Sequence, residues 1–158
     1  MAMKKKGGDF VSKQLYDTAY SILALGGTMP TMKMEALVYH TNVEWLQKTG
    51  EFLFPEQFQA WTVGPVVWEL FRLHRGMWVI NLDDLQKQHP QMRLLKERQL
   101  KLARKIVADY GKLTLQELHN RFNMPGTPWK TARRNLKSYE PATENNLITK
   151  QMLRAYYL

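Results

Sequence analysis

Residues 54–71 read Phe54-Pro55-Glu56-Gln57-Phe58-Gln59-Ala60-Trp61-Thr62-Val63-Gly64-Pro65-Val66-Val67-Trp68-Glu69-Leu70-Phe71. This stretch combines several aromatic side chains with a Gly-Pro corner, and glycine and proline are the residues that most strongly mark a change of chain direction. It contains no plausible catalytic group. We therefore expect this stretch to stabilise the fold or to form a binding surface, which favours a protein that binds a partner.

Apolar residues at helical spacing flank this stretch and predict several helices. Residues 9–25 end at a pair of glycines and residues 32–48 end at Gly50, because glycine tolerates the left-handed conformation that closes a helix. Gly64-Pro65 is expected to open a third helix, since proline is preorganised for a first helical turn. The other expected helices are a short one at 82–88 and further ones at 92–110, 115–122, 129–136 and 144–157.

The expected fold is mainly α, a compact single-domain helical bundle of about six to seven helices. Short segments rich in β-formers predict one small β-hairpin, or an extended loop, near residues 52–63. A length of 158 residues suits one domain, and 44% hydrophobic residues argue against global disorder. We expect a flexible basic N-terminus at residues 1–8 and one helical domain at 9–158.

Composition excludes several classes of protein. The chain has no cysteine, so disulfides and thiolate metal sites are excluded. Residues 9–25 are amphipathic and no apolar run reaches the length of a membrane span, so neither a signal peptide nor a membrane partner is expected. The expected localisation is cytoplasmic.

Catalytic and metal-binding patterns are missing from the sequence. The histidines, His40, His74, His89 and His119, have no second ligand at metal spacing and are expected to be structural. The adjacent carboxylates Asp83-Asp84 would not face one another on a helix and suit a helix start. Neither a Gly-rich phosphate loop nor a nucleophile elbow occurs. We expect no enzyme activity, no catalytic residue, no metal and no cofactor.

Positive charge is concentrated in residues 91–137. This span holds twelve basic and three acidic residues, so it carries the whole net charge of +9. A one-sided field of this kind favours an acidic partner, either a protein or a nucleic acid, although a solvated helix face would have the same composition. The residues expected to steer such a partner are Lys96, Lys101, Arg104, Lys105 and Arg134.

Residues 114–136 have the outline of a DNA-binding helix-turn-helix, which is the alternative function. Asn123 lies at the turn, and Lys130, Arg133 and Arg134 would lie near phosphates. Two features weigh against it. His119 stands where helix crossing usually requires a small residue, and two prolines stiffen and lengthen the turn.

Segments spread over about residues 9–158 carry a family resemblance. In order they include Met32-Lys33-Met34-Glu35-Ala36-Leu37-Val38-Tyr39, Ala60-Trp61-Thr62-Val63-Gly64-Pro65-Val66, Glu69-Leu70, Tyr110-Gly111 and Pro128-Trp129-Lys130-Thr131-Ala132-Arg133. The chain resembles the Panacea domain, the antitoxin-type domain of bacterial and prophage toxin-antitoxin systems. His119-Asn120 stand where that family often has Thr-His, so no histidine role is transferred to this place.

The resemblance implies a protein that neutralises a cognate toxin by direct, non-catalytic binding. Some relatives instead look like adaptors that deliver a toxin to a protease. The residues expected to bind the partner or to form the motif are Trp61, Gly64, Pro65, Val66, Trp129 and Arg133. The five tryptophans of the chain are otherwise expected to build the core, and Trp61 suits either role because it lies in an irregular segment.

Overall fold

A computed structural model describes residues 11–158, and the flexible terminus predicted at residues 1–8 lies outside them. The described chain is mainly α with minor β structure, as the sequence predicts, and it has eight helices where about six to seven were expected. The elements are α1 (Lys13–Gly26), β1 (Met29–Pro30), α2 (Thr31–Thr49), β2 (Phe58–Trp61), β3 (Gly64–Val67), α3 (Trp68–His74), β4 (Val79–Ile80), α4 (Leu82–Gln88), α5 (Glu97–Tyr110), α6 (Leu115–Phe122), α7 (Pro128–Ala132), β5 (Leu147–Ile148) and α8 (Lys150–Tyr157).

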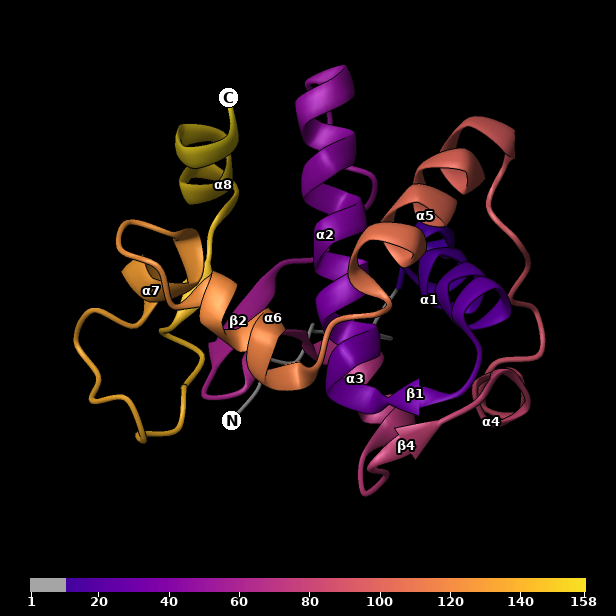
Figure 1. The fold of residues 1–158 in the computed structure, drawn as a ribbon, viewed down its shortest axis with the longest axis horizontal. Coiled ribbons are helices and arrows are strands. Elements are labelled where there is room, and N and C mark those ends of the chain that lie inside the picture. Colours follow the sequence, from indigo (N-terminus) through magenta and orange to yellow (C-terminus); the bar gives the residue numbers. More distant parts are fainter. Residues whose placement is uncertain (1–10) are drawn as a thin grey trace.

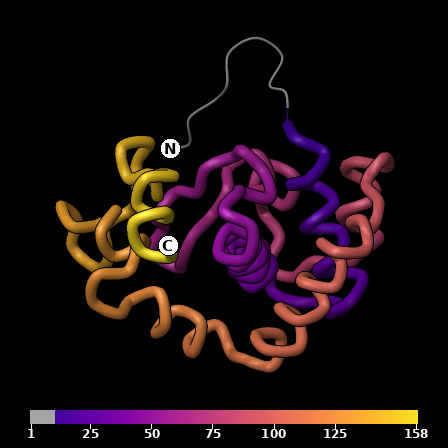
Figure 2. The backbone as a smooth tube through the Cα atoms, turned by 90° about the horizontal axis from the view of Figure 1, so that it is seen from above, coloured from indigo at the N-terminus to yellow at the C-terminus, as the bar shows by residue number. Residues whose placement is uncertain are grey.

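Helix α2 lies at the centre of the molecule. It runs between the α1–α5 side and the α6–α8 side (Figure 1), and it is seen end-on with the other elements around it in Figure 2. Helices α1, α5, α6 and α8 and strands β1 and β3 all contact it. From Met34 to Val43 every α2 residue is buried, which is expected of a helix that is covered on all sides.

The β-hairpin lies later in the chain than predicted. Strand β2 pairs with β3 in antiparallel register, and β5 pairs with the other edge of β2. Gly64-Pro65 therefore belongs to a strand and does not open a helix, which begins at Trp68. Proline is tolerated because β3 is an edge strand of the three-stranded sheet. Gly64 has φ +140°, which favours glycine at the start of the strand.

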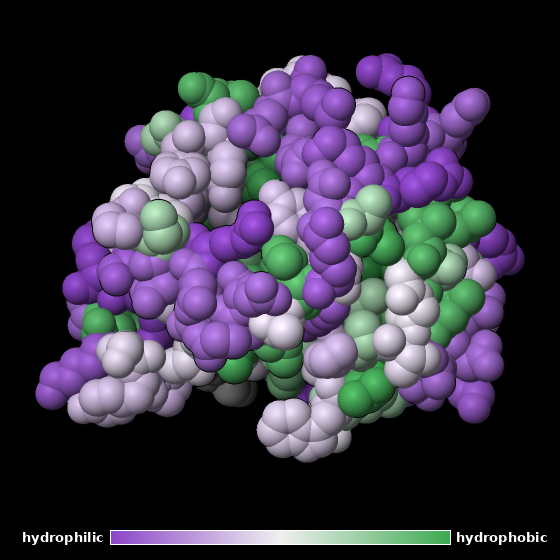
Figure 3. Space-filling view, viewed as in Figure 1, coloured by the Kyte–Doolittle hydropathy of each residue, from purple (hydrophilic) through white to green (hydrophobic). Residues whose placement is uncertain are grey.

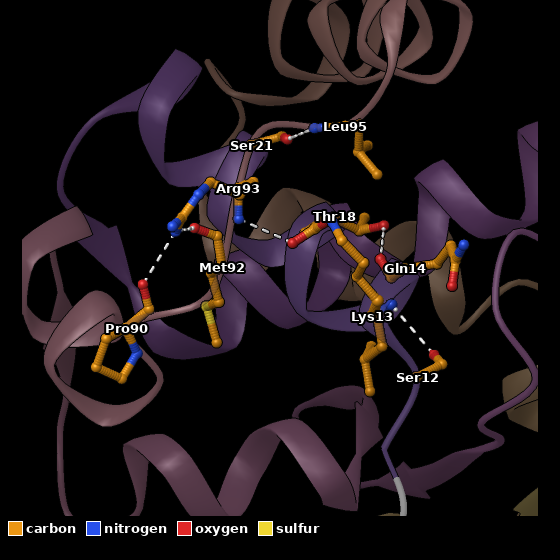
Figure 4. Close-up of polar contacts among 11 residues, drawn as sticks. Ser12, Lys13, Gln14, Thr18, Ser21, Pro90, Met92, Arg93 and Leu95 are labelled. Atoms are coloured by element: carbon orange, nitrogen blue, oxygen red, sulfur yellow. Dashed lines mark hydrogen bonds and ion pairs between the residues drawn. The ribbon is translucent and has the colours of Figure 1, made fainter.

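Helix α5 begins at Glu97 and not at residue 92, because the segment before it binds to α1 in an extended form. The Leu95 amide donates to Ser21 Oγ at 2.9 Å (Figure 4), and the Arg93 amide donates to Asp17 Oδ1 at 2.9 Å. Side chains of α1 thus satisfy two backbone amides that lie in the first turn of the predicted helix.

The C-terminal part holds less helix than predicted. Helix α7 ends at Ala132 and not at residue 136. Helix α8 begins at Lys150 and not at residue 144, because Leu147 and Ile148 pair with β2. The Ala60 amide also donates to the carbonyl of Asn146 at 2.9 Å. The backbone of residues 146–148 therefore bonds to β2 and does not form the first turn of the predicted helix.

A buried carboxylate joins α2 to the hairpin and to α3. Glu35 Oε1 accepts from the Val67 amide at 3.0 Å, and Glu35 Oε2 lies 2.7 Å from His74 Nε2. Both side chains are fully buried. Burial raises the pKa of the Glu35 carboxyl, while the hydrogen bond and charge of His74 and the Val67 amide act in the opposite direction. The contact fixes the point at which β3 ends and α3 begins.

Replacing Glu35 by alanine is expected to lower the free energy of unfolding by about 3–5 kcal/mol, because it leaves buried polar partners unpaired. Glu35→Gln should cost less, since its amide oxygen can still accept from Val67. Glu51→Ala, at an exposed position, is the control. Chemical denaturation measures all three, and a Glu35→Ala protein as stable as Glu51→Ala would contradict this account.

Candidate functional site

The two motif segments that carry the family resemblance contact each other. Trp129 Nε1 donates to the carbonyl of Trp61 at 2.7 Å, and Arg133 Nη1 donates to the carbonyl of Ala60 at 2.7 Å. The Arg133 guanidinium also lies 5.3 Å from the centre of a Trp129 ring. These side-chain hydrogen bonds to the backbone of β2 hold the region around α7 against the hairpin.

Most of the residues expected to bind a partner are buried. Trp129 is 4% exposed and Arg133 is 5% exposed, and Gly64, Pro65 and Val66 are buried in β3. Arg133 also donates to the carbonyls of Lys137 and Glu140, so its guanidinium is bound to backbone. Burial and backbone contacts give these five residues a role in the fold, which agrees with their assignment to the motif, and direct contact with a partner stays a prediction. Of the six, Trp61 keeps a partly exposed side chain.

Trp61 belongs to a half-exposed aromatic cluster. Its ring lies 4.7 Å from that of Phe71, and Phe71 lies 5.6 Å from Trp68. Arg75 places its guanidinium 4.9 Å from the Trp68 ring centre, which is cation–π distance. Aromatic and arginine side chains are typical anchors of protein interfaces.

The predicted basic face is divided by the fold. Lys96, Lys101, Arg104 and Lys105 are exposed on α5 or just before it. Arg134 is exposed just after α7, and α5 and α7 lie on opposite sides of α2 (Figure 1), so Arg134 is not part of this face.

Lys105 is partly neutralised by two carboxylates. Its ammonium lies 3.1 Å from Glu44 and 2.9 Å from Asp109. The hydrogen bonds to Asp109 and Glu44 raise the pKa of Lys105, so Lys105 stays charged. The two carboxylates nevertheless reduce the positive potential that Lys105 presents to a partner. Two cations that were not among the predicted steering residues, Lys48 and Arg98, join Lys101 and Lys105 around a notch of about 350 Å³ beside Trp45.

The helix-turn-helix alternative gains no support from α6 and α7. Thr114 caps α6 and forms a capping box with Glu117, as predicted. Helix α7, however, has only five residues, and its Trp129 and Ala132 are buried. A recognition helix must present side chains along a major groove, and the exposed cations here are Arg121 at the end of α6, Lys130 in α7 and Arg134 after it.

An apolar groove that the sequence did not reveal lies between the start of α2, the β2–β3 turn, the segment before β4 and α6. We name it the Trp78 groove, and it has a volume of about 350 Å³. Its lining residues are Pro30, Thr31, Met32, Thr62, Val63, Trp78, Leu115, Gln116 and His119. The Trp78 side chain is 89% exposed, and Val63 and Leu115 are 49% and 43% exposed.

The backbone around Trp78 is fixed although its side chain is exposed. The Thr31 amide donates to the Trp78 carbonyl at 2.9 Å, and the Thr31 hydroxyl donates to the Met77 carbonyl at 3.1 Å. Figure 3 shows apolar side chains low on this face, near β1 and β4, while polar ones gather over the upper ends of α2 and α5. Strand alternation would place Trp78 on the same face as the buried Ile80, so this local pattern does not reveal the outward Trp78.

A second hollow, which we name the tyrosine cavity, lies between α2, α5, α6 and α8, is partly open to solvent and measures about 210 Å³. Its lining residues are Tyr39, His40, Val43, Glu44, Gln47, Tyr110, Arg121, Phe122, Thr127, Pro128, Trp129, Tyr156 and Tyr157. The Tyr39 and Tyr157 hydroxyls lie 3.4 Å apart, and burial raises the pKa of Tyr157 to about 12.

His40 is the unusual group of this cavity. Its ring is stacked with Tyr110 at 4.1 Å and with Phe122 at 5.3 Å. Burial, and then the charge of Arg121, lowers the pKa of His40 to about 3, so the ring is neutral at pH 7. Its Nε2 atom is buried and has no hydrogen-bond partner, which costs about 1–3 kcal/mol.

Residues 11–158 hold no group of three or more His, Asp or Glu side chains placed to bind a metal ion. The Asp83-Asp84 pair lies in the first turn of α4, where Asp84 forms a capping box with Asn81, as expected of a helix start. None of the helices in this part of the chain combines the length and the apolar character needed to cross a bilayer. The chain matches no family model, no curated protein and no solved structure.

His40 predicts a measurable pH dependence of stability. A pKa of about 3 in the folded state and 6.5 in the unfolded state means that the unfolded chain binds the extra proton between these values. The neutral histidine contributes stability above pH 6.5 that is lost as pH falls towards 3. His40→Phe cannot titrate, so its stability relative to wild type should rise by up to about 1.4 kcal/mol per pH unit on acidification. Denaturant titrations from pH 7 to 4 measure the free energy of unfolding of both proteins. A difference between His40→Phe and wild type that stays constant over this range would refute the assignment.

Proposed function

We propose that the protein is an antitoxin-like binding protein that neutralises a toxin by direct contact, without catalysis. The Trp78 groove is the observation that carries this proposal. Exposed apolar patches of this kind mark protein interaction sites, and tryptophan is among the residues that most often dominate binding energy. Because Thr31 already holds the Trp78 backbone, little of it remains to be ordered when a partner binds.

The toxin as partner class rests on the resemblance to the Panacea domain. The contact between Trp61 and Trp129 supports it, because it gives the two motif segments a common structural role. On this proposal the motif holds the hairpin in place, and the neighbouring surface, with Val63 in the hairpin turn, binds the toxin. Delivery of the bound toxin to a protease is a variant of the same proposal.

An acidic surface on the partner suits the α5 face. Lys96, Lys101 and Arg104 are exposed, and no ion pair joins them to a carboxylate in the described residues. Such charges accelerate association more than they strengthen the final complex. We therefore assign steering to this face and affinity to the Trp78 groove.

The direct test is to express the open reading frame encoded beside this protein, with and without it, and to purify the pair together. Growth arrest that is relieved through a stable complex is the expected result. Arrest that this protein relieves without any complex, or no arrest and no complex, would overturn the proposal.

Trp78→Ser is expected to weaken the complex about 30-fold or more, since it removes an interface anchor. The free protein should keep its stability, because the side chain is 89% exposed. Tyr139→Ser is the matched control, an aromatic side chain that is 71% exposed and does not line the groove. Calorimetry of the purified pair measures both variants. Equal loss, or no loss, in the two variants would place the interface elsewhere.

Changing Lys96, Lys101 and Arg104 together to Glu should slow association with the toxin about tenfold or more at low salt, and flatten its salt dependence. The dissociation rate should change little. Stopped-flow or surface-binding kinetics at several salt concentrations measure both rates.

The control for this variant changes Lys87, Arg134 and Lys137 to Glu. It alters the net charge equally but at exposed positions outside α5. The same slowing in both variants would show that only net charge matters and would remove the steering role from α5.

A further inference from the structure

The notch beside Trp45 collects cations from two helices, and we name it the Trp45 notch. Lys48 comes from the last turn of α2. Arg98, Lys101 and Lys105 come from α5, where a spacing of three and then four residues puts them on one side of the helix. No residue that lines the notch is acidic, so the hollow presents positive charge from both of its walls.

Three of these cations are available to an anion. Lys48, Arg98 and Lys101 are exposed, and no ion pair joins them to a carboxylate within residues 11–158. Lys105 differs, because Glu44 and Asp109 already bind it. Like charges around one small hollow repel one another, so a polyanion that neutralises the three together is favoured.

Trp45 gives the notch an aromatic wall. Its side chain packs against the core but stays partly exposed where it borders the notch. The Arg98 guanidinium lies 5.7 Å from the centre of a Trp45 ring, so a planar cation lies next to the indole. Nucleic-acid bases stack on aromatic rings and on arginine planes. Cations combined with such a stacking surface are typical of sites for single-stranded nucleic acid.

We propose that the Trp45 notch binds a single-stranded nucleic acid. One base lies against Trp45 and Arg98, and the adjoining phosphates lie at Lys48 and Lys101. The notch volume of about 350 Å³ is ample for one planar base. Bases inside a duplex are already paired and stacked, so a duplex has none to place there. An acidic protein surface would match the cations, and the indole wall beside them is what favours a base.

The Trp45 notch is separate from the proposed toxin site. Thr31 and Met32, at the start of α2, line the Trp78 groove, whereas Trp45 lies near the end of the same helix. Met32 and Trp45 are about 20 Å apart along the helix axis at a rise of 1.5 Å per residue. No residue lines both hollows, so either site can fail without the other. Lys101 also belongs to the steering face, but steering acts before contact and leaves the notch unoccupied.

The test is a titration of a labelled single strand of about ten nucleotides with the full chain, followed by fluorescence anisotropy at several salt concentrations. Saturable binding is expected. Its logarithmic salt slope should be about −2 or steeper, since about three neutralised phosphates contribute about 0.7 each. DNA and RNA strands of the same sequence identify the source. Absence of saturation by both at low salt, or a duplex of that sequence that binds as tightly, would overturn the proposal.

The indole ¹H–¹⁵N signal of Trp45 reports the contact in the unaltered chain. It should shift in step with saturation by the oligonucleotide. The signal of Trp129 should not move, because its Nε1 already donates to the carbonyl of Trp61. Inorganic polyphosphate, which has the charge but no base, should shift the Trp45 signal less. A Trp45 signal that the oligonucleotide leaves in place would overturn the proposal.

Changing Lys48, Arg98 and Lys101 together to Ser should weaken oligonucleotide binding about tenfold or more and bring the salt slope close to zero. The matched control removes three exposed cations that do not line the notch, Lys87, Lys130 and Lys137, in the same way. Equal weakening in the two variants would show that only net charge matters and would overturn the proposal.

Trp45→Leu should weaken the oligonucleotide about tenfold, because it removes the stacking surface, and should leave polyphosphate binding unchanged. Leucine keeps an apolar side chain against the core. Oligonucleotide binding that stays unchanged in this variant would overturn the proposal, and the charge variant and the Trp45 signal decide the matter if the variant does not fold.

Discussion

The rest of the fold depends on one buried carboxylate. Glu35 lies in the centrally placed α2, accepts from the last amide of β3 and binds His74 at the end of α3. It thereby fixes the hairpin and α3 on the same helix. The hairpin then provides the carbonyls that Trp129 and Arg133 bind, and the chain that leaves α3 carries Trp78. A carboxyl in such surroundings is costly, and the partner that each of its two oxygens has offsets that cost.

In this arrangement the residues that stabilise the fold differ from the residues that are exposed on its surface. Arg133 and Trp129 bind backbone and are buried, whereas Trp78 is held through its backbone and exposes its ring. An exposed indole of this kind contributes nothing to the core. The exposed indole leaves apolar surface in contact with water, which is unfavourable in the free protein. A binding protein must keep such a surface available for its partner.

Much of the helical structure could be predicted from the sequence, because the apolar spacing of α1, α2 and α6 and the caps of α6 are local signals. The errors arose where tertiary contacts override local preference. Gly64-Pro65 resembles a helix start, but the Val67 amide is bound by Glu35, far away in the sequence. Arg133 resembles a surface cation, but backbone carbonyls surround it. The exposure of Trp78 depends on Thr31, so the groove could not be read from either segment alone.

We propose that a protein partner binds at the Trp78 groove. Hydrogen–deuterium exchange of this protein, free and in complex with the product of the neighbouring reading frame, can locate the bound surface. We expect protection on binding at residues 61–63, 77–80 and 115–119, with little change in the tyrosine cavity. Protection confined to residues 129–137 or to α8, with the groove unchanged, would contradict it.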